Sequence, residues 1–139
     1  MTVETLRFQV AQHQCDHLGH MNASHYMGYF ADAAFSMMTH LELGPAEARR
    51  LNVGMAAVRV EIDFVAEALG GDVLVCETSI ESVGDKKLVY LHRLYRADTG
   101  ETIAKARLTA VCLDLAQRRA VAMPAATLEA ARRHVITPS

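Results

Sequence analysis

The side chains best suited to chemistry gather in one short polar stretch of the sequence, residues 12–25. Its carboxylate, Asp16, could attack a carbonyl carbon directly or act as a general base toward a water molecule. An aspartate in a glycine-containing loop could equally be a turn residue that hydrogen-bonds its own backbone. Taken alone, the residue type leaves both interpretations open.

Histidines crowd the same stretch and raise the question of a metal site. The four are His13, His17, His20 and His25. The spacing of His17 and His20, together with Asp16, could supply ligands to zinc. No carboxylate or thiolate cluster elsewhere in the sequence completes an obvious set, which favours loop hydrogen bonds and substrate contacts. We therefore predict no metal and no cofactor.

A strand before this stretch and a helix after it must position it. Residues 4–11 alternate between apolar and polar side chains, which is typical of a strand with one buried face. From residue 26 to 41 apolar side chains recur at helical spacing, and Asn22 or Ser24 can cap the helix start. Asp32 is the one formal charge in residues 26–41, which predicts a helix covered on most sides.

The rest of the chain favours a sheet closed by a final helix. A short helix is predicted over residues 45–51 and a terminal helix over 124–134, each with a proline at its start. Alternation predicts strands over residues 58–64, 72–83, 86–97, 101–114 and 119–122. Turn residues between them, such as Gly70-Gly71, predict an antiparallel meander. The fold class is therefore α+β, with a curved antiparallel sheet of five to six strands around one long helix.

Length and composition limit the classes of protein to which this sequence can belong. The 139 residues are 51% hydrophobic and 22% charged, which fits one globular domain over residues 1–139. A net charge of -2 argues against a nucleic-acid partner, and no apolar run reaches the roughly 18–20 residues of a membrane span. The start of the sequence lacks the apolar core of a signal peptide. Three cysteines without a CxxC pair favour a reducing, cytoplasmic location.

The loop before the long helix resembles a known family. Residues 16–22, Asp-His-Leu-Gly-His-Met-Asn, followed by Tyr26, are similar to the corresponding loop of hotdog-fold acyl-CoA thioesterases, most closely the 4-hydroxybenzoyl-CoA thioesterase family. That loop has an Asp, two residues, a Gly, often His-x-Asn, and then an aromatic residue early in the helix. Weaker similarity at residues 71–72, 83–88 and 123–124 extends the resemblance over nearly the whole chain.

The resemblance implies a fold, an assembly and a reaction. The fold is the hotdog fold, in which the long helix lies in a curved antiparallel sheet. Two protomers pair edge to edge as a homodimer, such dimers often associate into homotetramers, and the active site lies at the dimer interface. The reaction is hydrolysis of an acyl-CoA thioester to a carboxylic acid and CoA. An open sheet edge supports the pairing independently, because unpaired edges recruit further strands.

The resemblance also assigns catalytic roles within the loop. Asp16 is the expected nucleophile or general base, and the backbone amide of Ala23 is expected to polarise the thioester carbonyl. We expect His20 to orient the loop or Asp16, and Asn22 to bond the loop or cap the helix.

Substrate-binding residues are predicted with weaker support. Gly19 would allow a close backbone approach, and Tyr26 would either line the acyl pocket or pack in the core. Lys86, Lys87 and Arg59 could bind the phosphates of CoA, although single basic residues on strands are more often solvated. The long helix also offers apolar side chains for an adaptable acyl pocket, namely Met27, Phe30, Met37 and Met38.

Two alternatives to this function stay open. The family often has an acidic residue about five positions after the early-helix aromatic, where this sequence has Ala31 and then Asp32. A mid-helix catalytic carboxylate at Asp32 is therefore a weaker alternative to Asp16. The protein could also be a non-catalytic acyl-CoA-binding module or a hotdog hydratase or dehydratase. The acyl group, and CoA rather than acyl-carrier protein as the carrier, are not readable from the sequence.

Overall fold

The computed structural model describes residues 1–136, so residues 137–139 of the predicted domain 1–139 lie outside the described range. The first part of the chain consists of β1 (Val3–Gln9), the 3-10 turns η1 (Gln12–Gln14) and η2 (Ala23–His25), α1 (Tyr26–Thr39) and α2 (Pro45–Leu51). The second part consists of β2 (Val53–Phe64), β3 (Val73–Val83), β4 (Lys87–Arg96), β5 (Thr102–Asp114), β6 (Arg119–Ala120) and α3 (Ala125–Arg133).

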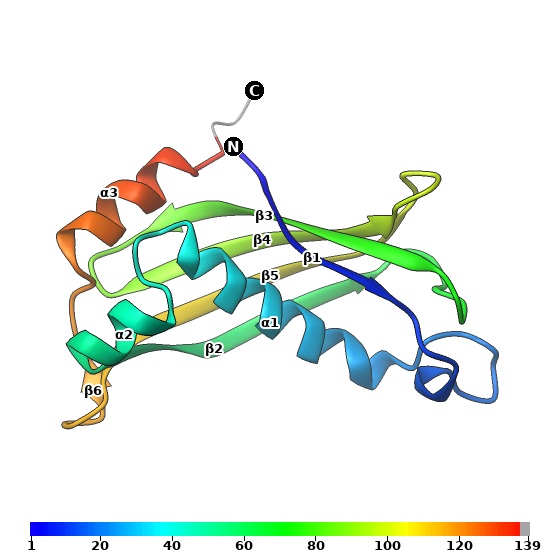
Figure 1. Cartoon of the computed structure of the whole chain (residues 1–139), viewed down its shortest axis with the longest axis horizontal. Helices are drawn as coiled ribbons and strands as arrows, with labels where there is room; N and C mark the ends of the chain where they lie inside the picture. Colours follow the sequence, from blue (N-terminus) through cyan, green and yellow to red (C-terminus); the bar gives the residue numbers. More distant parts are fainter. Residues whose placement is uncertain (137–139) are drawn as a thin grey trace.

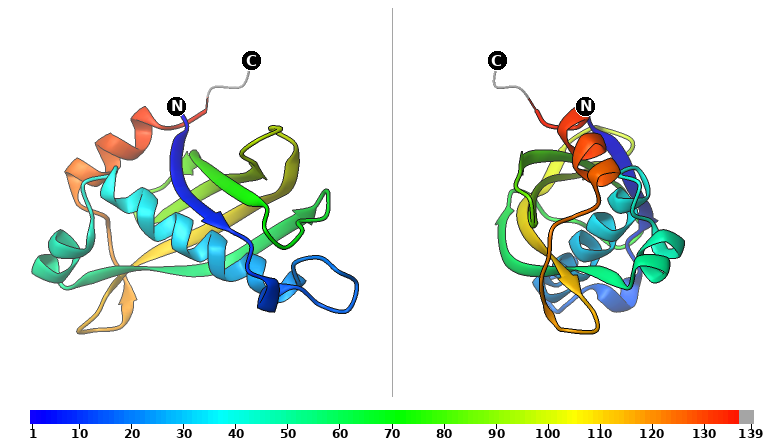
Figure 2. Two further views of the ribbon diagram at one scale, coloured as in Figure 1. Left: turned by 45° about the vertical axis from the view of Figure 1, so that its right-hand side comes forward. Right: turned by 90° about the vertical axis from the view of Figure 1, so that its left-hand side faces the viewer.

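One antiparallel sheet forms the body of the molecule. Its strand order is β1-β3-β4-β5-β2, and the short β6 pairs with β5. The sheet curls around α1, which lies along its concave face (Figure 1; Figure 2). This arrangement confirms the predicted α+β class, the number of strands and the single long helix.

The predicted meander is correct from β3 to β6 and wrong for β2. The structure pairs β2 with β5 at the far edge of the sheet, and not with β3. The Gly70-Gly71 pair therefore does not close a hairpin, and residues 65–72 cross the end of the sheet instead. Gly71 has a φ of +92°, so the chain does turn there. Turn residues indicate that a chain bends but do not say which strands then pair, which explains the wrong pairing.

Strand β2 starts earlier than predicted and contains an irregularity. It begins at Val53, where small residues obscure the alternation. A register shift between Ala57 and Arg59 breaks the ladder with β5 and leaves Val58 61% exposed. β2 is also an edge strand, so one side of its backbone has no neighbour among the described residues.

Helix α1 is buried on one side only. Phe30, Met37 and Met38 face the sheet and are almost fully buried in the core. Phe30 and Met37 therefore have no free surface for the predicted acyl pocket, whereas Met38 borders a cavity at the other end of α1, and the pocket itself stays a prediction. Phe35 is 61% exposed and Met27 is 38% exposed, so the chain itself does not wrap the helix on most sides. The missing charges along the helix mark an apolar face that stays open in a single chain.

A polar cluster lies inside the core beneath α1. Thr78 Oγ1 is 2.7 Å from His92 Nδ1, and Thr5 Oγ1 is 2.9 Å from Thr78 Oγ1. The His92 ring stacks with Phe30 and Tyr90. Burial lowers the pKa of His92 to about 4, so the imidazole is neutral at neutral pH.

The cysteines and the helices bear on two predictions, one about packing and one about location. Cys76 and Cys112 are buried, which confirms that they pack, and all three cysteines are free thiols. No helix within residues 1–136 is long and apolar enough to cross a membrane. The cytoplasmic location stays a prediction.

Candidate active site

A tight turn over residues 16–19 presents the candidate catalytic carboxylate. The Gly19 amide donates to the Asp16 carbonyl at 3.0 Å, and the Leu18 amide donates to Asp16 Oδ1 at 2.9 Å. Gly19 has a φ of +86°, a conformation that L side chains rarely adopt. Gly19 therefore shapes the turn, and its contact with substrate stays a prediction.

The Asp16 carboxylate is held at both oxygens. Asn22 Nδ2 donates to Asp16 Oδ2 at 2.9 Å, opposite the Leu18 amide on Oδ1. These two hydrogen bonds hold the pKa of Asp16 below its usual value, and the bond from the Leu18 amide has the larger effect. The nearby His20 and His17 lower this pKa further. The carboxylate is therefore anionic at neutral pH, and each oxygen keeps lone pairs for further contacts.

Asn22 joins this carboxylate to the start of the helix. Its Oδ1 accepts a hydrogen bond from the Ser24 amide at 2.9 Å, which caps the turn η2 that leads into α1. Its Nδ2 binds Asp16 at the same time. The two roles considered for Asn22 are therefore combined in one side chain.

The Ala23 amide is the free donor at this helix start. The Ser24 amide is taken by the Asn22 side chain, and the His25 amide by the Asn22 carbonyl at 3.1 Å. Within residues 1–136 the Ala23 amide makes no hydrogen bond. An N–H without a partner at the positive end of a helix can bind the oxygen of a polarised carbonyl.

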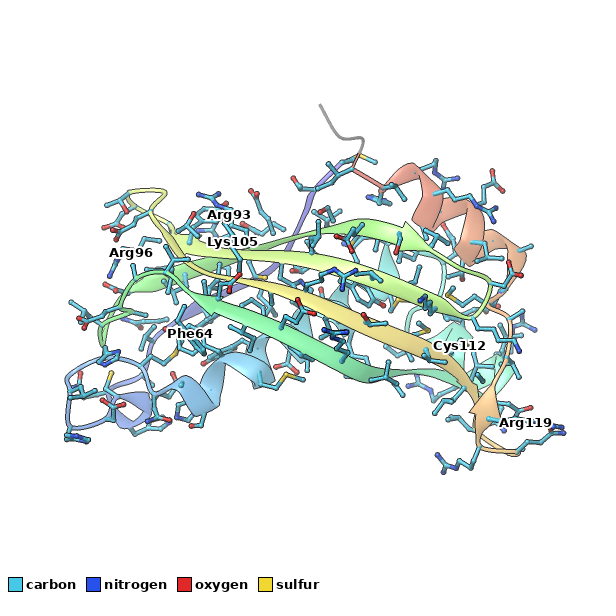
Figure 3. All side chains as sticks on the ribbon, turned by 180° about the vertical axis from the view of Figure 1, so that it is seen from behind. Phe64, Arg93, Arg96, Lys105, Cys112 and Arg119 are labelled. Atoms are coloured by element: carbon cyan, nitrogen blue, oxygen red, sulfur yellow. The ribbon has the colours of Figure 1, made fainter. Side chains whose placement is uncertain are left out.

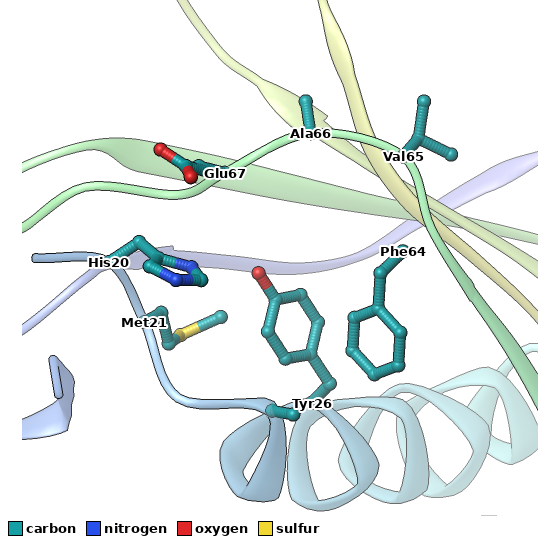
Figure 4. Close-up of a pocket in the computed structure, with 8 residues that line it drawn as sticks. His20, Met21, Tyr26, Phe64, Val65, Ala66 and Glu67 are labelled. Atoms are coloured by element: carbon teal, nitrogen blue, oxygen red, sulfur yellow. The ribbon is translucent and has the colours of Figure 1, made fainter. Parts of the chain in front are cut away.

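A cavity of about 230 Å³ opens beside Ala23 (Figure 4). Its walls are His20, Met21, Ala23, Tyr26 and residues 64–67. Tyr26 is 3% exposed and meets the Phe64 ring edge to face, with ring centroids 4.9 Å apart. Tyr26 therefore packs in the core and borders this cavity, and its contact with an acyl group stays a prediction.

The sequence analysis missed the wall formed by residues 64–67. These residues belong to the segment that crosses the end of the sheet, where a hairpin was predicted. The amides of Val65 and Ala66 both donate to the Ile103 carbonyl, and Arg96 donates to the Glu67 carbonyl. The adjacent apolar pair Phe64 and Val65 was the available signal, because such a pair is unusual in a solvated hairpin turn.

The predicted phosphate-binding residues lie away from this cavity within one chain. The Lys86 carbonyl accepts a hydrogen bond from the Cys112 amide at 2.8 Å. Cys112 and Phe64 lie at opposite ends of the sheet (Figure 3). Lys86 and the adjacent Lys87 lie at the Cys112 end, far from Phe64 and the cavity. Arg59 forms an exposed ion pair with Glu61 at 2.9 Å and does not line the cavity. Within the described chain, none of the three lines the cavity beside Ala23.

The competing carboxylate and the competing metal site gain no support from the geometry. Asp32 is exposed on α1, and neither Asp32 nor Asp16 lines the cavity beside Ala23. Asp16 differs in being hydrogen-bonded to Asn22, the residue that directly precedes Ala23. Among the described residues, no group of three His, Cys, Asp or Glu side chains could hold a metal ion. His17 and His20 are the histidines near enough to Asp16 to affect its pKa.

Comparison with solved structures defines the class of fold. A 1,4-dihydroxy-2-naphthoyl-CoA thioesterase from Synechocystis aligns with a TM-score of 0.80 at 21% identity, over 95% of this chain and 96% of that chain. A hypothetical Staphylococcus aureus protein in complex with CoA aligns with a TM-score of 0.86 at 19% identity, over 99% of this chain and 87% of that chain. The fold is therefore the hotdog fold of these proteins.

Sequence comparison then gives the family. Residues 10–131 match the thioesterase-like superfamily, and the chain belongs to it. An L-carnitine dehydrogenase/betainyl-CoA thioesterase from Agrobacterium fabrum is 31% identical over 115 residues. That match covers 83% of this chain and 23% of the relative, so the chain spans only about a quarter of that longer protein.

Proposed function

We propose that the protein hydrolyses acyl-CoA thioesters to the free carboxylic acid and CoA. The observation that carries the proposal is the coupling of two groups through one residue. Asn22 holds the anionic carboxylate of Asp16 and directly precedes Ala23, whose amide is free beside the cavity. One group can attack or activate water, and the other can stabilise the developing oxyanion.

The reaction uses these groups in one of two ways. In both, the Ala23 amide donates to the thioester oxygen as negative charge develops there. In the first, an Asp16 oxygen bonds to the carbonyl carbon, CoA leaves as the thiolate, and water then hydrolyses the mixed anhydride. In the second, Asp16 takes a proton from water as the water attacks, and the departing sulfur is protonated.

The names of related proteins support a CoA thioester as substrate. The Agrobacterium relative is named for betainyl-CoA thioesterase activity, and the Synechocystis neighbour is a 1,4-dihydroxy-2-naphthoyl-CoA thioesterase. The Staphylococcus neighbour was solved with CoA bound. Their acyl groups differ widely, so the shared part is the CoA thioester.

Thiol release from a panel of acyl-CoAs tests the proposal. Asp16→Asn should lower kcat roughly 100-fold or more, because it removes a catalytic carboxylate and keeps the side-chain shape. Asp32→Asn is the matched control, since it removes an exposed carboxylate of α1, and it should stay near wild type. The reverse pattern would make Asp32 the catalytic group.

Other outcomes separate the alternative functions. Tight binding of acyl-CoAs by the wild type without cleavage would indicate a binding module. Loss of enoyl-CoA absorbance without thiol release would indicate a hydratase. Either outcome would overturn the proposed hydrolysis.

We also infer that the active protein is a homodimer paired through β2. This 12-residue edge strand is unpaired on its outer side within the described chain. Val58 and Phe64 on it are 61% and 55% exposed, and Phe35 of the neighbouring α1 face is 61% exposed. Long apolar edges of this kind are pairing sites.

Dimerisation also suggests how basic residues reach the substrate. In a two-fold pair the two β2 strands run antiparallel, so opposite ends of the two sheets come together. Lys86 of the partner subunit would then lie toward the end that carries Phe64. This arrangement would supply positive charge for the phosphates of CoA, which a single chain does not bring to the cavity.

A further inference from the structure

Gln14 connects the loop that carries Asp16 to two other elements. Its side-chain oxygen accepts a hydrogen bond from the Ala11 amide at 3.0 Å, just after β1, and its Nε2 donates to the Tyr29 hydroxyl on α1 at 2.6 Å. Its carbonyl accepts a hydrogen bond from the Asn22 amide at 2.9 Å. One partly buried residue therefore binds the end of a strand, the long helix and the residue that holds Asp16.

The direction of both side-chain bonds follows from the groups involved. A backbone N–H can only donate, so the carboxamide oxygen of Gln14 faces Ala11 and its NH2 group faces Tyr29. The Tyr29 ring stacks against Phe8 of β1, with ring centroids 3.7 Å apart and an interplanar angle of 11°. The Tyr29 hydroxyl therefore lies at a position set by two packed elements, and it holds the Gln14 side chain in one orientation.

The carbonyl of Gln14 lies at the base of the loop. Residues 14–16 and 20–22 form a short antiparallel ladder, and the bond between the Gln14 carbonyl and the Asn22 amide is its first rung. A shift of this carbonyl moves Asn22, whose side chain binds Asp16 Oδ2. Because a displacement of about 1 Å can cost roughly 100-fold in rate, the base of the ladder matters to the catalytic carboxylate.

The contact with Tyr29 exceeds what the local turn requires. The bond from the Ala11 amide to Gln14 already closes the turn η1, and the Tyr29 hydroxyl takes no part in it. Among the described residues, neither Gln14 nor Tyr29 lines the cavity beside Ala23. A buried-side hydrogen bond that neither the turn nor the cavity uses is suited to fixing the loop between β1 and α1.

We propose that Gln14 is a positioning residue of the thioesterase site and that Tyr29 is its anchor. Gln14 acts through Asn22, which binds Asp16 Oδ2 at 2.9 Å and directly precedes Ala23. The proposal rests on the proposed hydrolysis and adds two residues to that same site. Because neither residue borders the cavity, their contact should affect kcat and leave KM nearly unchanged.

Tyr29→Phe is the first test, because it removes the acceptor of the Gln14 bond and keeps the ring that stacks on Phe8. Thiol release is measured with the acyl-CoA of the panel that the wild type cleaves fastest. We expect kcat to fall roughly tenfold, with KM within about twofold of the wild-type value.

The acidity of Asp16 gives a readout that needs no turnover. A looser Asn22 donor should raise the pKa of Asp16, so the acidic limb of the kcat/KM profile should move to higher pH. His17 and His20 are the titratable groups that face Asp16, and Tyr29→Phe leaves both unchanged. Titration of the Asp16 carboxyl by carbon NMR measures the same shift directly.

Two changes at Gln14 separate the contact from the residue that makes it. In Gln14→Glu a carboxylate can accept from the Ala11 amide and from the Tyr29 hydroxyl, so kcat at the high-pH plateau should stay within about threefold of wild type. Gln14→Ala loses both bonds and should fall at least as far as Tyr29→Phe. Combining Gln14→Glu with Tyr29→Phe should cancel the rescue, because the carboxylate then has no hydroxyl to accept from.

Tyr95→Phe is the matched control. The Tyr95 hydroxyl also binds a single side chain, Glu77 at 2.9 Å, but this bond lies within the β3–β4 pair and not at the loop. The variant should keep the kcat and the pH profile of the wild type. Urea titrations of all variants report the free energy of unfolding alongside the rates.

The outcomes distinguish this proposal from the one on which it rests. Wild-type kcat and an unmoved pKa of Asp16 in Tyr29→Phe would overturn the positioning role and leave hydrolysis standing. An equal loss of kcat in Tyr95→Phe would overturn it as well. If the wild type cleaves no acyl-CoA, the proposed hydrolysis fails, and the titration of Asp16 in Tyr29→Phe still decides whether Gln14 holds the carboxylate.

Discussion

Asp16 and Asn22 form a pair in which one side chain sets the acidity of the other. The Leu18 amide and Asn22 Nδ2 hold the pKa of Asp16 below its usual value. Asn22→Ser keeps an oxygen that can cap η2 but removes the donor to Asp16. We therefore expect the pKa of Asp16 to rise and the acidic limb of the kcat/KM profile to move to higher pH.

The control for this prediction separates acidity from folding. Asn22→Ala removes the cap as well as the donor, so it should also lower the free energy of unfolding by about 1 kcal/mol. Asn22→Ser should lose much less stability in the same denaturant titration. An acidic limb that stays in place in Asn22→Ser would mean that Asn22 does not tune Asp16.

His92 makes a second prediction at the scale of one residue. Burial lowers its pKa to about 4, whereas the unfolded chain has the ordinary value near 6.5. As pH falls, the unfolded state therefore binds the extra proton first. The contribution of His92 to the free energy of unfolding is fully present only above about pH 6.5. Between pH 6.5 and 4 this one group should lower the free energy of unfolding by roughly 3 kcal/mol.

Urea titrations across this pH range measure the effect. His92→Asn places an amide near the position of Nδ1, which can keep the hydrogen bond to Thr78. The variant should show a shallower loss of stability on acidification than the wild type, even if it is less stable at pH 7. Equal slopes for both proteins would show that His92 is not the group responsible.

At the scale of elements, the loop before α1 depends on one backbone conformation. Gly19 has a φ of +86° and open space around its missing Cβ, so strain and not collision opposes a side chain there. We expect Gly19→Ala to cost about 1 kcal/mol of stability. The larger effect should be on kcat, because the same turn supplies the Leu18 amide to Asp16.

Rates and unfolding curves for two alanine variants check this expectation. Gly84→Ala changes a glycine of the turn between β3 and β4 that has neither a positive φ nor a crowded neighbour. It should keep wild-type kcat, whereas Gly19→Ala should lose it. Wild-type activity in Gly19→Ala would show that the loop tolerates other geometries.

The elements themselves were largely predictable, but one connection was not. Helical spacing identified α1, and alternation identified β3, β4 and β5. These patterns are local, so a single sequence carries them in full. The pairing of β2 with β5 depends on contacts between distant segments, and no pattern within residues 53–72 specifies it.

This one error also hid part of the site. Because residues 65–72 were read as a hairpin, Phe64 and Glu67 were not considered beside Tyr26. The Asp16 loop was found because its residues are contiguous and follow a recognisable order. The opposite wall comes from a crossing segment, and its proximity to Ala23 exists only in three dimensions.

At the scale of the whole molecule, the open faces of α1 and β2 make the strongest case for a second copy. An apolar groove between α1 and β2 is lined by Phe35, Met55 and Ala57, among others. It lies along the strand whose outer edge is unpaired. The few charges of α1, which predicted a helix covered on most sides, are also what an interface between two copies requires.

Strand β2 therefore provides the final prediction, in which assembly and activity change together. Val58→Lys puts a charge on the edge and should convert the proposed dimer to a monomer in light scattering, without unfolding it, because Val58 is already 61% exposed. The monomer should lose acyl-CoA affinity, since Lys86 of the partner subunit no longer reaches the site. Val73→Lys is the control, because Val73 is 42% exposed on β3, which lies between β1 and β4. A monomeric Val58→Lys with wild-type KM would show that one chain holds the complete site.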